Sequence, residues 1–462
     1  MSYAPTPPAP ATAGNLYLEG PFAPVPREET HADLHVEGTL PVELDGLYVR
    51  NGPNPFKRPD PRRHHWFVGD GMVHGIRLQA GRALWYRNRW VGGNRLHAAL
   101  GRPPIAGQPR GLFDTVNTNV YAHAGRLWAS VEAGPYPIEL DPELASRRHG
   151  LFDSALDLPF SAHPHRDPIS GDLHAVCYDA RRLNRLYYMR VSARGQVDRT
   201  VEIPVKGGPM VHDCAITRSQ VIVLDLPVTF SFRRLLQRAA FPYAWNPRHP
   251  ARVGLLPREG DARDIRWYAV DPCYVFHPCN AYDDEDGSVV LDVVVHPRMF
   301  DRSRIGPESG RAPTFERWRL PAGGHDVRRD VISGIAQEFP RLDESRVAQR
   351  YRYAYAVEFT VDAAGGQRLL KHDLDTRRTQ AHHFAADRKP GEFVFVPRRA
   401  SSDEDDGWLL GYAFNLARGR GELHVIDAQR IEAPAVAIVP VPAPIPMGFH
   451  GNWIDIRELG GA

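Results

Sequence analysis

The sequence predicts an all-β fold, and among all-β folds it favours a β-propeller. Proline and glycine are both abundant, with 42 and 40 residues, and the apolar runs are short. This combination predicts many short strands joined by turns. Strand-like segments and turns alternate along the chain, and strands do not alternate with long helices as in a βαβ fold. Repeated antiparallel sheets in one long chain favour a propeller, with several stacked β-sandwiches as the alternative.

The ordered part of the chain is expected to begin just after residue 13. Residues 1–13 (MSYAPTPPAPATA) are rich in proline and alanine, which is typical of a disordered tail. Residues 14–462 are expected to form one domain, although this length could also hold two or three. The first dense turn lies at residues 51–55, where two prolines exclude helix. Residues 66–76 are then predicted to form a strand, a tight turn and a second strand.

The strand-turn-strand pattern continues from there to the C-terminus. Each predicted strand is a short run rich in β-branched and aromatic residues, bounded by turn residues. The predicted strands include residues 116–122, 125–132, 172–179, 186–191, 221–227, 288–296, 354–361, 393–397 and 408–414.

One segment, from Phe230 to Phe241, departs from this pattern. It carries three arginines among apolar residues, which predicts a short helical insertion. The insertion either packs on the rim of a sheet with its arginines in solvent, or presents an apolar face to a membrane surface or an incoming substrate.

Composition excludes several classes of protein. The formal net charge is +2 and 24% of the residues are charged, so no basic excess indicates a nucleic-acid partner. None of the four cysteines forms a CxxC pair, so neither a zinc knuckle nor a disulfide scaffold is indicated. The N-terminus lacks the pattern of a signal peptide, and no stretch is long and apolar enough to span a bilayer. A reduced, cytoplasmic compartment is the expected location, with peripheral membrane contact left open, and the chain is expected to be a monomer.

Four of the 21 histidines share a local pattern that indicates a metal site. Each ends an apolar stretch and is followed by a residue that turns the chain. They lie 49, 65 and 173 residues apart, which is too far for a zinc finger or ribbon. Such separations suit a propeller, in which inner strands of different blades converge on one axis. The four are His163, His212, His277 and His450.

Imidazole ligands indicate iron, copper or zinc, because magnesium and calcium prefer oxygen. Each ligating ring also needs an acceptor for its second nitrogen. Glu132, Glu338 and Glu392 have apolar neighbours, unlike an ordinary solvated glutamate, and are the candidate acceptors. His64 and His65 lie in a basic, proline-rich loop and are predicted to face solvent.

These motifs resemble the carotenoid cleavage oxygenases, a family that includes retinoid isomerases and stilbene-cleaving dioxygenases. The resemblance runs from about residue 17 to residue 457. Its marks are LYVRNGPNP at 47–55, HWFVGDGMVH at 65–74, AHPH at 162–165, MVHD at 210–213, FHP at 276–278, EFPRLD at 338–343 and GFHG at 448–451.

The resemblance implies a seven-bladed β-propeller, capped by loops and short helices over an Fe(II) on its axis. It implies that the four histidines bind the iron and that the three glutamates hold three of the rings, leaving His163 without a carboxylate. It also places Thr118 near an open coordination position. O2 would be the co-substrate, and an apolar conjugated alkene would be cleaved to two carbonyl products.

The resemblance favours a carotenoid or apocarotenoid over a stilbenoid substrate. Stilbene cleavers of the family carry a lysine just before the first glutamate and a tyrosine upstream, which bind the phenolic hydroxyl. Here Val131 replaces the lysine, and residues 105–109 (IAGQP) offer no tyrosine. Stilbenoid cleavage remains the alternative within the family. A propeller that only binds partners and a zinc hydrolase are the alternatives from other classes.

Overall fold

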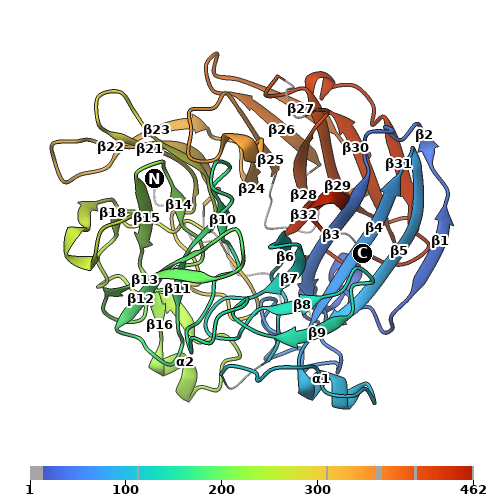
Figure 1. Ribbon diagram of the computed structural model, residues 1–462, viewed down its shortest axis with the longest axis horizontal. Helices are drawn as coiled ribbons and strands as arrows, with labels where there is room; N and C mark the ends of the chain where they lie inside the picture. The colour runs from blue at the N-terminus through green and yellow to red at the C-terminus, as the bar shows by residue number, and fades with distance from the viewer. Residues whose placement is uncertain (1–13, 112–113, 309–310, 359–366, 400–402, 460–462) are drawn as a thin grey trace, which may run out of the picture.

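Seven antiparallel sheets of four or five strands form the blades of a β-propeller in the computed structural model (Figure 1). The structure describes residues 14–111, 114–308, 311–358, 367–399 and 403–459. The predicted tail, residues 1–13, lies outside them. The prediction of an all-β propeller is therefore confirmed.

Blades one to four are built mainly from the first 270 residues. Blade one contains β1 (Thr30–Leu34), β5 (Arg82–Val91), β4 (Gly71–Gln79), β3 (Gly46–Pro53) and β32 (Gly451–Asp455). Blade two contains β6 (Asn119–His123), β7 (Arg126–Ser130), β8 (Ile138–Leu140) and β9 (Ser146–His149). Blade three contains β10 (His165–Arg166), β11 (Leu173–Tyr178), β12 (Arg185–Val191) and β13 (Val197–Pro204). Blade four contains β14 (Ala215–Ile216), β15 (Gln220–Asp225), β18 (Arg252–Pro257) and β19 (Arg266–Ala269).

Blades five to seven follow in chain order. Blade five contains β20 (Pro278–Asp283), β21 (Val289–Val295), β22 (Thr314–Leu320) and β23 (Arg328–Ser333). Blade six contains β24 (Gln337–Arg341), β25 (Tyr353–Glu358), β26 (Arg368–Asp373) and β27 (Arg378–His383). Blade seven contains β28 (Arg388–Pro397), β29 (Gly407–Asn415), β30 (Arg420–Asp427), β31 (Ala437–Pro440) and β2 (Glu37–Gly38).

The hydrophobic pattern of each strand matches its place in the blade. The second strand of blade five, β21, reads VVLDVVV and is buried throughout, because neighbouring blades cover both of its faces. The outer strand of blade three, β13, instead alternates between more and less buried residues. The core therefore lies between adjacent blades, where Val49 of β3 and Val120 of β6, for example, belong to one apolar cluster.

The two ends of the chain close the ring together. The last strand, β32, pairs with β3, from Gly46 opposite Asp455 to Arg50 opposite Gly451 (Figure 1). The C-terminal strand is an inner strand, and it belongs to the blade of the N-terminal strands. In return, β2 from the N-terminal region pairs with β31 at the outer edge of blade seven.

The predicted insertion lies in blade four, between β15 and β18. It forms a two-stranded sheet of β16 (Val228–Phe230) and β17 (Tyr243–Trp245), which flank the helix α2 (Phe232–Leu236). Phe232, Leu235 and Leu236 of α2 are exposed, while Arg234 is buried and donates to the Phe300 carbonyl at 2.8 Å. Contact of this helix with a membrane stays a prediction. Neither α2 nor the other described α-helix, α1 (Asn94–Ala99), is long enough to cross a bilayer.

Residues 66–68 do not form the predicted strand. Only the second half of that segment is a strand, β4, while Trp66 and Phe67 belong to a loop. Their rings pack on Phe449, with centroid distances of 4.8 and 5.4 Å. The apolar pattern arises because these rings face an internal cavity.

Candidate metal centre

The four predicted histidines lie together at the starts of four inner strands. His163 precedes β10, His212 precedes β14, His277 precedes β20 and His450 precedes β32. All four are buried, and one ring nitrogen of each lies within 4.8 Å of those of the others. Four blades therefore supply one side chain each to the same point, despite the long separations in sequence.

Thr118 holds the corresponding place in blade two, since it directly precedes β6. It is buried and lines the cavity beside the histidines. Its hydroxyl donates to Asn117 Oδ1 at 3.1 Å, and its carbonyl accepts from the His450 backbone N–H at 3.1 Å. Thr118 thus helps to position His450, and its role beside an open coordination position stays a prediction.

Three glutamates hold three of the histidine rings. His212 Nδ1 lies 2.9 Å from both carboxylate oxygens of Glu132. His277 Nδ1 donates to Glu338 Oε2 at 2.7 Å, and His450 Nδ1 donates to Glu392 Oε1 at 3.0 Å. Because each carboxylate accepts, the proton of each of these rings resides on Nδ1.

Two of the glutamates project toward the axis from β-bulges. The pairing of β24 with β25 shifts between Glu338 and Arg341, and that of β28 with β29 shifts between Pro390 and Phe393. A bulge re-aims the side chains of its strand, often next to a functional site. Blades six and seven therefore contribute carboxylates, whereas blades one, three, four and five contribute the histidines.

The arrangement of ring nitrogens fits a cation. With the protons on Nδ1, each Nε2 of His212, His277 and His450 presents a lone pair. His212 Nε2 and His277 Nε2 lie 3.3 Å apart, and His163 Nε2 is buried without a hydrogen-bond partner in the described structure. Lone pairs that face each other repel, and a cation bound between them removes this cost. Four imidazoles suit a divalent transition metal.

The ionisation of His163 and Glu392 agrees with a neutral ligand and a charged carboxylate. Burial, followed by the three neighbouring imidazoles, holds the pKa of His163 well below its ordinary value. Burial alone would raise the pKa of Glu392, but Arg341 and His450 outweigh it and lower that pKa to about 2. His163 is therefore held neutral and Glu392 is held as a carboxylate.

His163 lacks a direct carboxylate partner, as the resemblance implies. The nearest acid, Asp213, has its Oδ2 at 4.0 Å from His163 Nδ1, which is beyond hydrogen-bond distance. Asp213 Oδ1 instead accepts from His165 Nε2 at 2.8 Å.

His296 is a site residue that the sequence reasoning missed. Its Nε2 donates to Glu338 Oε1 at 2.5 Å, so Glu338 holds His277 and His296 together. The signal was present in the sequence, because His296 ends the apolar run of β21 and precedes a proline. His163 and His277 are likewise followed by a proline at the end of an apolar stretch.

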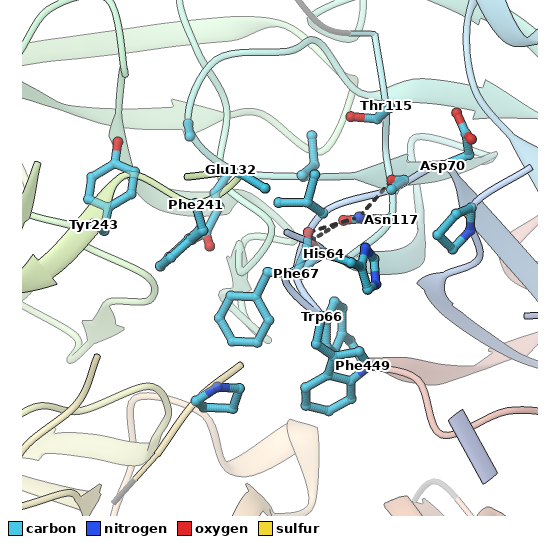
Figure 2. Close-up of a pocket in the computed structure, with 18 of the residues that line it drawn as sticks. His64, Trp66, Phe67, Asp70, Thr115, Asn117, Glu132, Phe241, Tyr243 and Phe449 are labelled. Carbon is cyan, nitrogen blue, oxygen red and sulfur yellow. Dashed lines mark hydrogen bonds between the residues drawn. The ribbon is translucent and has the colours of Figure 1, made fainter. Parts of the chain in front are cut away.

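His212, His277 and His450 line a cavity of about 920 Å³, and Figure 2 draws part of the lining of this cavity. Six phenylalanines line it, which makes it largely apolar: Phe56, Phe67, Phe241, Phe276, Phe339 and Phe449. His64 and His65 are buried, so the prediction that they face solvent is wrong. Their loop covers the cavity, and the His65 ring stacks on Phe241 with centroids 4.3 Å apart.

Comparison with known proteins agrees with this geometry. The family model of the retinal pigment epithelial membrane protein matches residues 22–455. A carotenoid cleavage oxygenase of Mycobacterium tuberculosis is 42% identical to this chain. The alignment covers 96% of this chain and 98% of that protein. The lignostilbene dioxygenase structure of Pseudomonas brassicacearum superposes with a TM-score of 0.85 at 26% identity, covering 97% of this chain and 100% of that one. A cobalt-substituted apocarotenoid oxygenase of Synechocystis gives 0.82 at 27%, covering 93% and 97%.

Proposed function

This chain belongs to the family of the retinal pigment epithelial membrane protein and the carotenoid cleavage oxygenases, and we propose that it cleaves a double bond of a carotenoid or apocarotenoid with Fe(II) and O2. It is an oxygenase that acts on carbon–carbon double bonds. The observation that carries the finer proposal is the convergence of four imidazole nitrogens, three of them from carboxylate-held rings, on one point beside an apolar cavity.

His163, His212, His277 and His450 would hold the metal. When bound, Fe(II) supplies the electrons that activate O2 for cleavage of the alkene to two carbonyl products. All four side chains are neutral ligands, so Glu132, Glu338 and Glu392 offset the charge from behind the rings. The resemblance of the fold to a cobalt-substituted oxygenase supports a divalent transition metal here.

The remaining work of the protein is to orient the substrate and to exclude water. The aromatic lining offers an extended, flat polyene large apolar contacts on both faces. The loop with Trp66 and Phe67 closes over Phe449, next to His450. A reactive polyene is thereby kept from solvent while it lies beside the histidines.

Stilbenoid cleavage is supported by the similarity of the fold to a lignostilbene dioxygenase and by a resveratrol cleavage oxygenase of Aspergillus fumigatus that is 30% identical over 93% of this chain. Val131 lines the cavity at the position where the family's stilbene cleavers carry a lysine. An aliphatic side chain there cannot donate to a phenolic oxygen. We therefore propose the polyene as substrate.

Product analysis tests the proposal directly. We expect iron-loaded protein to convert a carotenoid or apocarotenal to aldehydes or ketones with uptake of O2, and to do so neither under nitrogen nor after removal of iron by a chelator. The products are identified by mass spectrometry after incubation with β-carotene, apocarotenals and resveratrol. Cleavage of resveratrol alone would overturn the substrate class. Activity with zinc but without O2 would favour a hydrolase, and protein whose stability ignores chelators would favour a non-catalytic propeller.

Substitution of Glu338 should weaken metal binding more than substitution of a surface glutamate, because Glu338 is hydrogen-bonded to the rings of His277 and His296. We expect Glu338→Gln to weaken iron affinity about 10–100-fold, the usual cost of losing a partner of a metal ligand. Iron titration followed by metal analysis measures the change. Glu259→Gln is the matched control, since Glu259 lies at the surface and pairs with Arg190. Unchanged affinity in Glu338→Gln would contradict the assigned role.

A further inference from the structure

The loop between β3 and β4 lines much of the cavity and is pinned at both of its ends. Near its start, the Phe56 N–H donates to Asp70 Oδ2 at 2.9 Å. Near its end, the Asn117 side chain donates to the Gly69 carbonyl at 2.9 Å. The middle of the loop, residues 57–66, therefore lies over the cavity between two fixed ends. Surface loops with fixed, neighbouring ends are frequently functional.

The middle of this loop has few buried side chains of its own to hold it down. Five of the ten residues 57–66 are charged and exposed: Lys57, Arg58, Asp60, Arg62 and Arg63. Segments with few buried contacts open at a low free-energy cost. Contacts from other parts of the chain therefore decide how firmly the loop is closed.

Asn15, near the N-terminus, is hydrogen-bonded to the middle of the loop. Its side chain is buried, and its Nδ2 donates to the Pro61 carbonyl at 2.9 Å and to the His64 carbonyl at 3.0 Å. Its Oδ1 accepts from the Tyr17 N–H at 3.0 Å and so caps the short 3-10 helix Leu16–Leu18. One amide side chain thus joins two segments that are 46 to 49 residues apart in sequence.

Aromatic packing at Trp66 reinforces this contact. The Tyr17 ring stacks on Trp66, with centroids 5.0 Å apart and planes inclined by 12°, and the Phe22 ring packs edge to face on Trp66 at 5.3 Å. Trp66 also lines the cavity, where it lies beside Phe449 (Figure 2). Through Trp66, residues 14–22 therefore hold part of the cavity wall itself.

Residues 14–22 are in turn fixed to the C-terminal part of the chain. The Met447 N–H donates to the Pro21 carbonyl at 2.7 Å. The loop has a further contact that does not involve this segment, because the Trp66 N–H donates to the Ile305 carbonyl at 2.8 Å. Loss of the contacts to residues 14–22 should therefore loosen the loop without detaching it.

We propose that residues 14–22 form a strap that holds residues 57–66 closed over the cavity and thereby controls how fast an apolar molecule leaves it. This inference rests on the proposed function only for the identity of that molecule. Opening of the loop breaks the two hydrogen bonds from Asn15 and the stacking of Tyr17 on Trp66, while the pinned ends of the loop stay in place. These contacts add to the barrier for release, a step that often limits turnover in enzymes with a covered site.

Amide hydrogen exchange tests the strap without any ligand. Asn15→Asp keeps the oxygen that accepts from the Tyr17 N–H and removes the donor to the two loop carbonyls. We expect the Trp66 amide, which is hydrogen-bonded to Ile305 in the closed loop, to exchange about 30-fold faster, the usual effect of losing two net hydrogen bonds. Asn184→Asp is the matched control, since Asn184 is exposed in the turn between β11 and β12.

Release of a bound molecule measures the consequence for the cavity. Iron-loaded protein is saturated with an apocarotenal under nitrogen and mixed with lipid vesicles that take up the released compound, and dissociation is followed by stopped-flow absorbance. We expect release to be about 30-fold faster in Asn15→Asp and about fivefold faster in Tyr17→Leu, which removes the stacked ring. Iron affinity should stay unchanged in both variants, because neither residue contacts a metal ligand.

Three outcomes would overturn the strap. One is unchanged exchange of the Trp66 amide in both variants. Another is faster exchange along the whole chain with a lower melting temperature, because the change would then be a general loss of stability. The third is faster exchange of the loop without faster release. Failure of the proposed function is distinguishable, since iron-loaded wild-type protein would then neither bind nor cleave the apocarotenal, while exchange at Trp66 would still decide whether the strap holds the loop.

Discussion

His212→Ala is expected to give a folded protein that no longer retains iron. The change removes one of four converging ring nitrogens and leaves Glu132 without the ring that it holds. Loss of a partner behind a ligand already costs about 10–100-fold in metal affinity, so loss of a ligand should cost at least about 100-fold. Iron content after purification and anaerobic reloading measures the effect, and cleavage activity should disappear with the metal.

His450→Ala should behave in the same way, because His450 lies in the same cluster on a different blade. His325→Ala is the matched control, since His325 is exposed and does not belong to the cluster. A cooperative thermal transition in all three variants would show that the loss of iron does not arise from unfolding. Full iron occupancy in either His212→Ala or His450→Ala would contradict the four-histidine site.

Deletion of residues 444–462 is expected to abolish both the fold and metal binding. It removes β32, which pairs with β3 over five residues. It also removes contacts to other blades, because Arg341 donates to the Gly451 carbonyl at 3.0 Å and the Gly451 N–H donates to Glu392 Oε2 at 2.7 Å. Asn452 further donates to the Val120 carbonyl at 2.8 Å. Ring closure by one strand therefore joins four blades.

The expected loss is comparable with the whole stability of a typical domain, about 5–15 kcal/mol. Far-ultraviolet circular dichroism and thermal unfolding compare the truncated chain with His450→Ala. The point variant should keep a cooperative transition and lose metal, whereas the truncated chain should lose both. A truncated chain that stays folded and iron-loaded would show that β32 does not close the propeller.

The sequence alone was sufficient for the fold class and for the four histidines. Short apolar runs separated by turn residues predict strands from local sequence. A histidine that ends such a run, directly before a turn residue, is a local signal for a candidate metal ligand. The frame of His277 before Pro278 illustrates this. His296 shows where this local signal fails. It also ends an apolar run before a proline, yet its ring binds Glu338, the carboxylate that holds His277.

Other features were decided by the tertiary structure. The blade that receives β32 depends on how the ring closes, and no local pattern specifies a partner some 400 residues away. Trp66 and Phe67 are apolar enough for a strand, yet they cover the cavity. The sequence also cannot predict that the buried Tyr243 hydroxyl lacks a hydrogen-bond partner in the described structure. Whether a buried polar atom has a partner depends on all of its neighbours in space. Local chemistry thus determined which side chains could bind metal, and packing between distant segments decided which of them meet and what else faces the substrate.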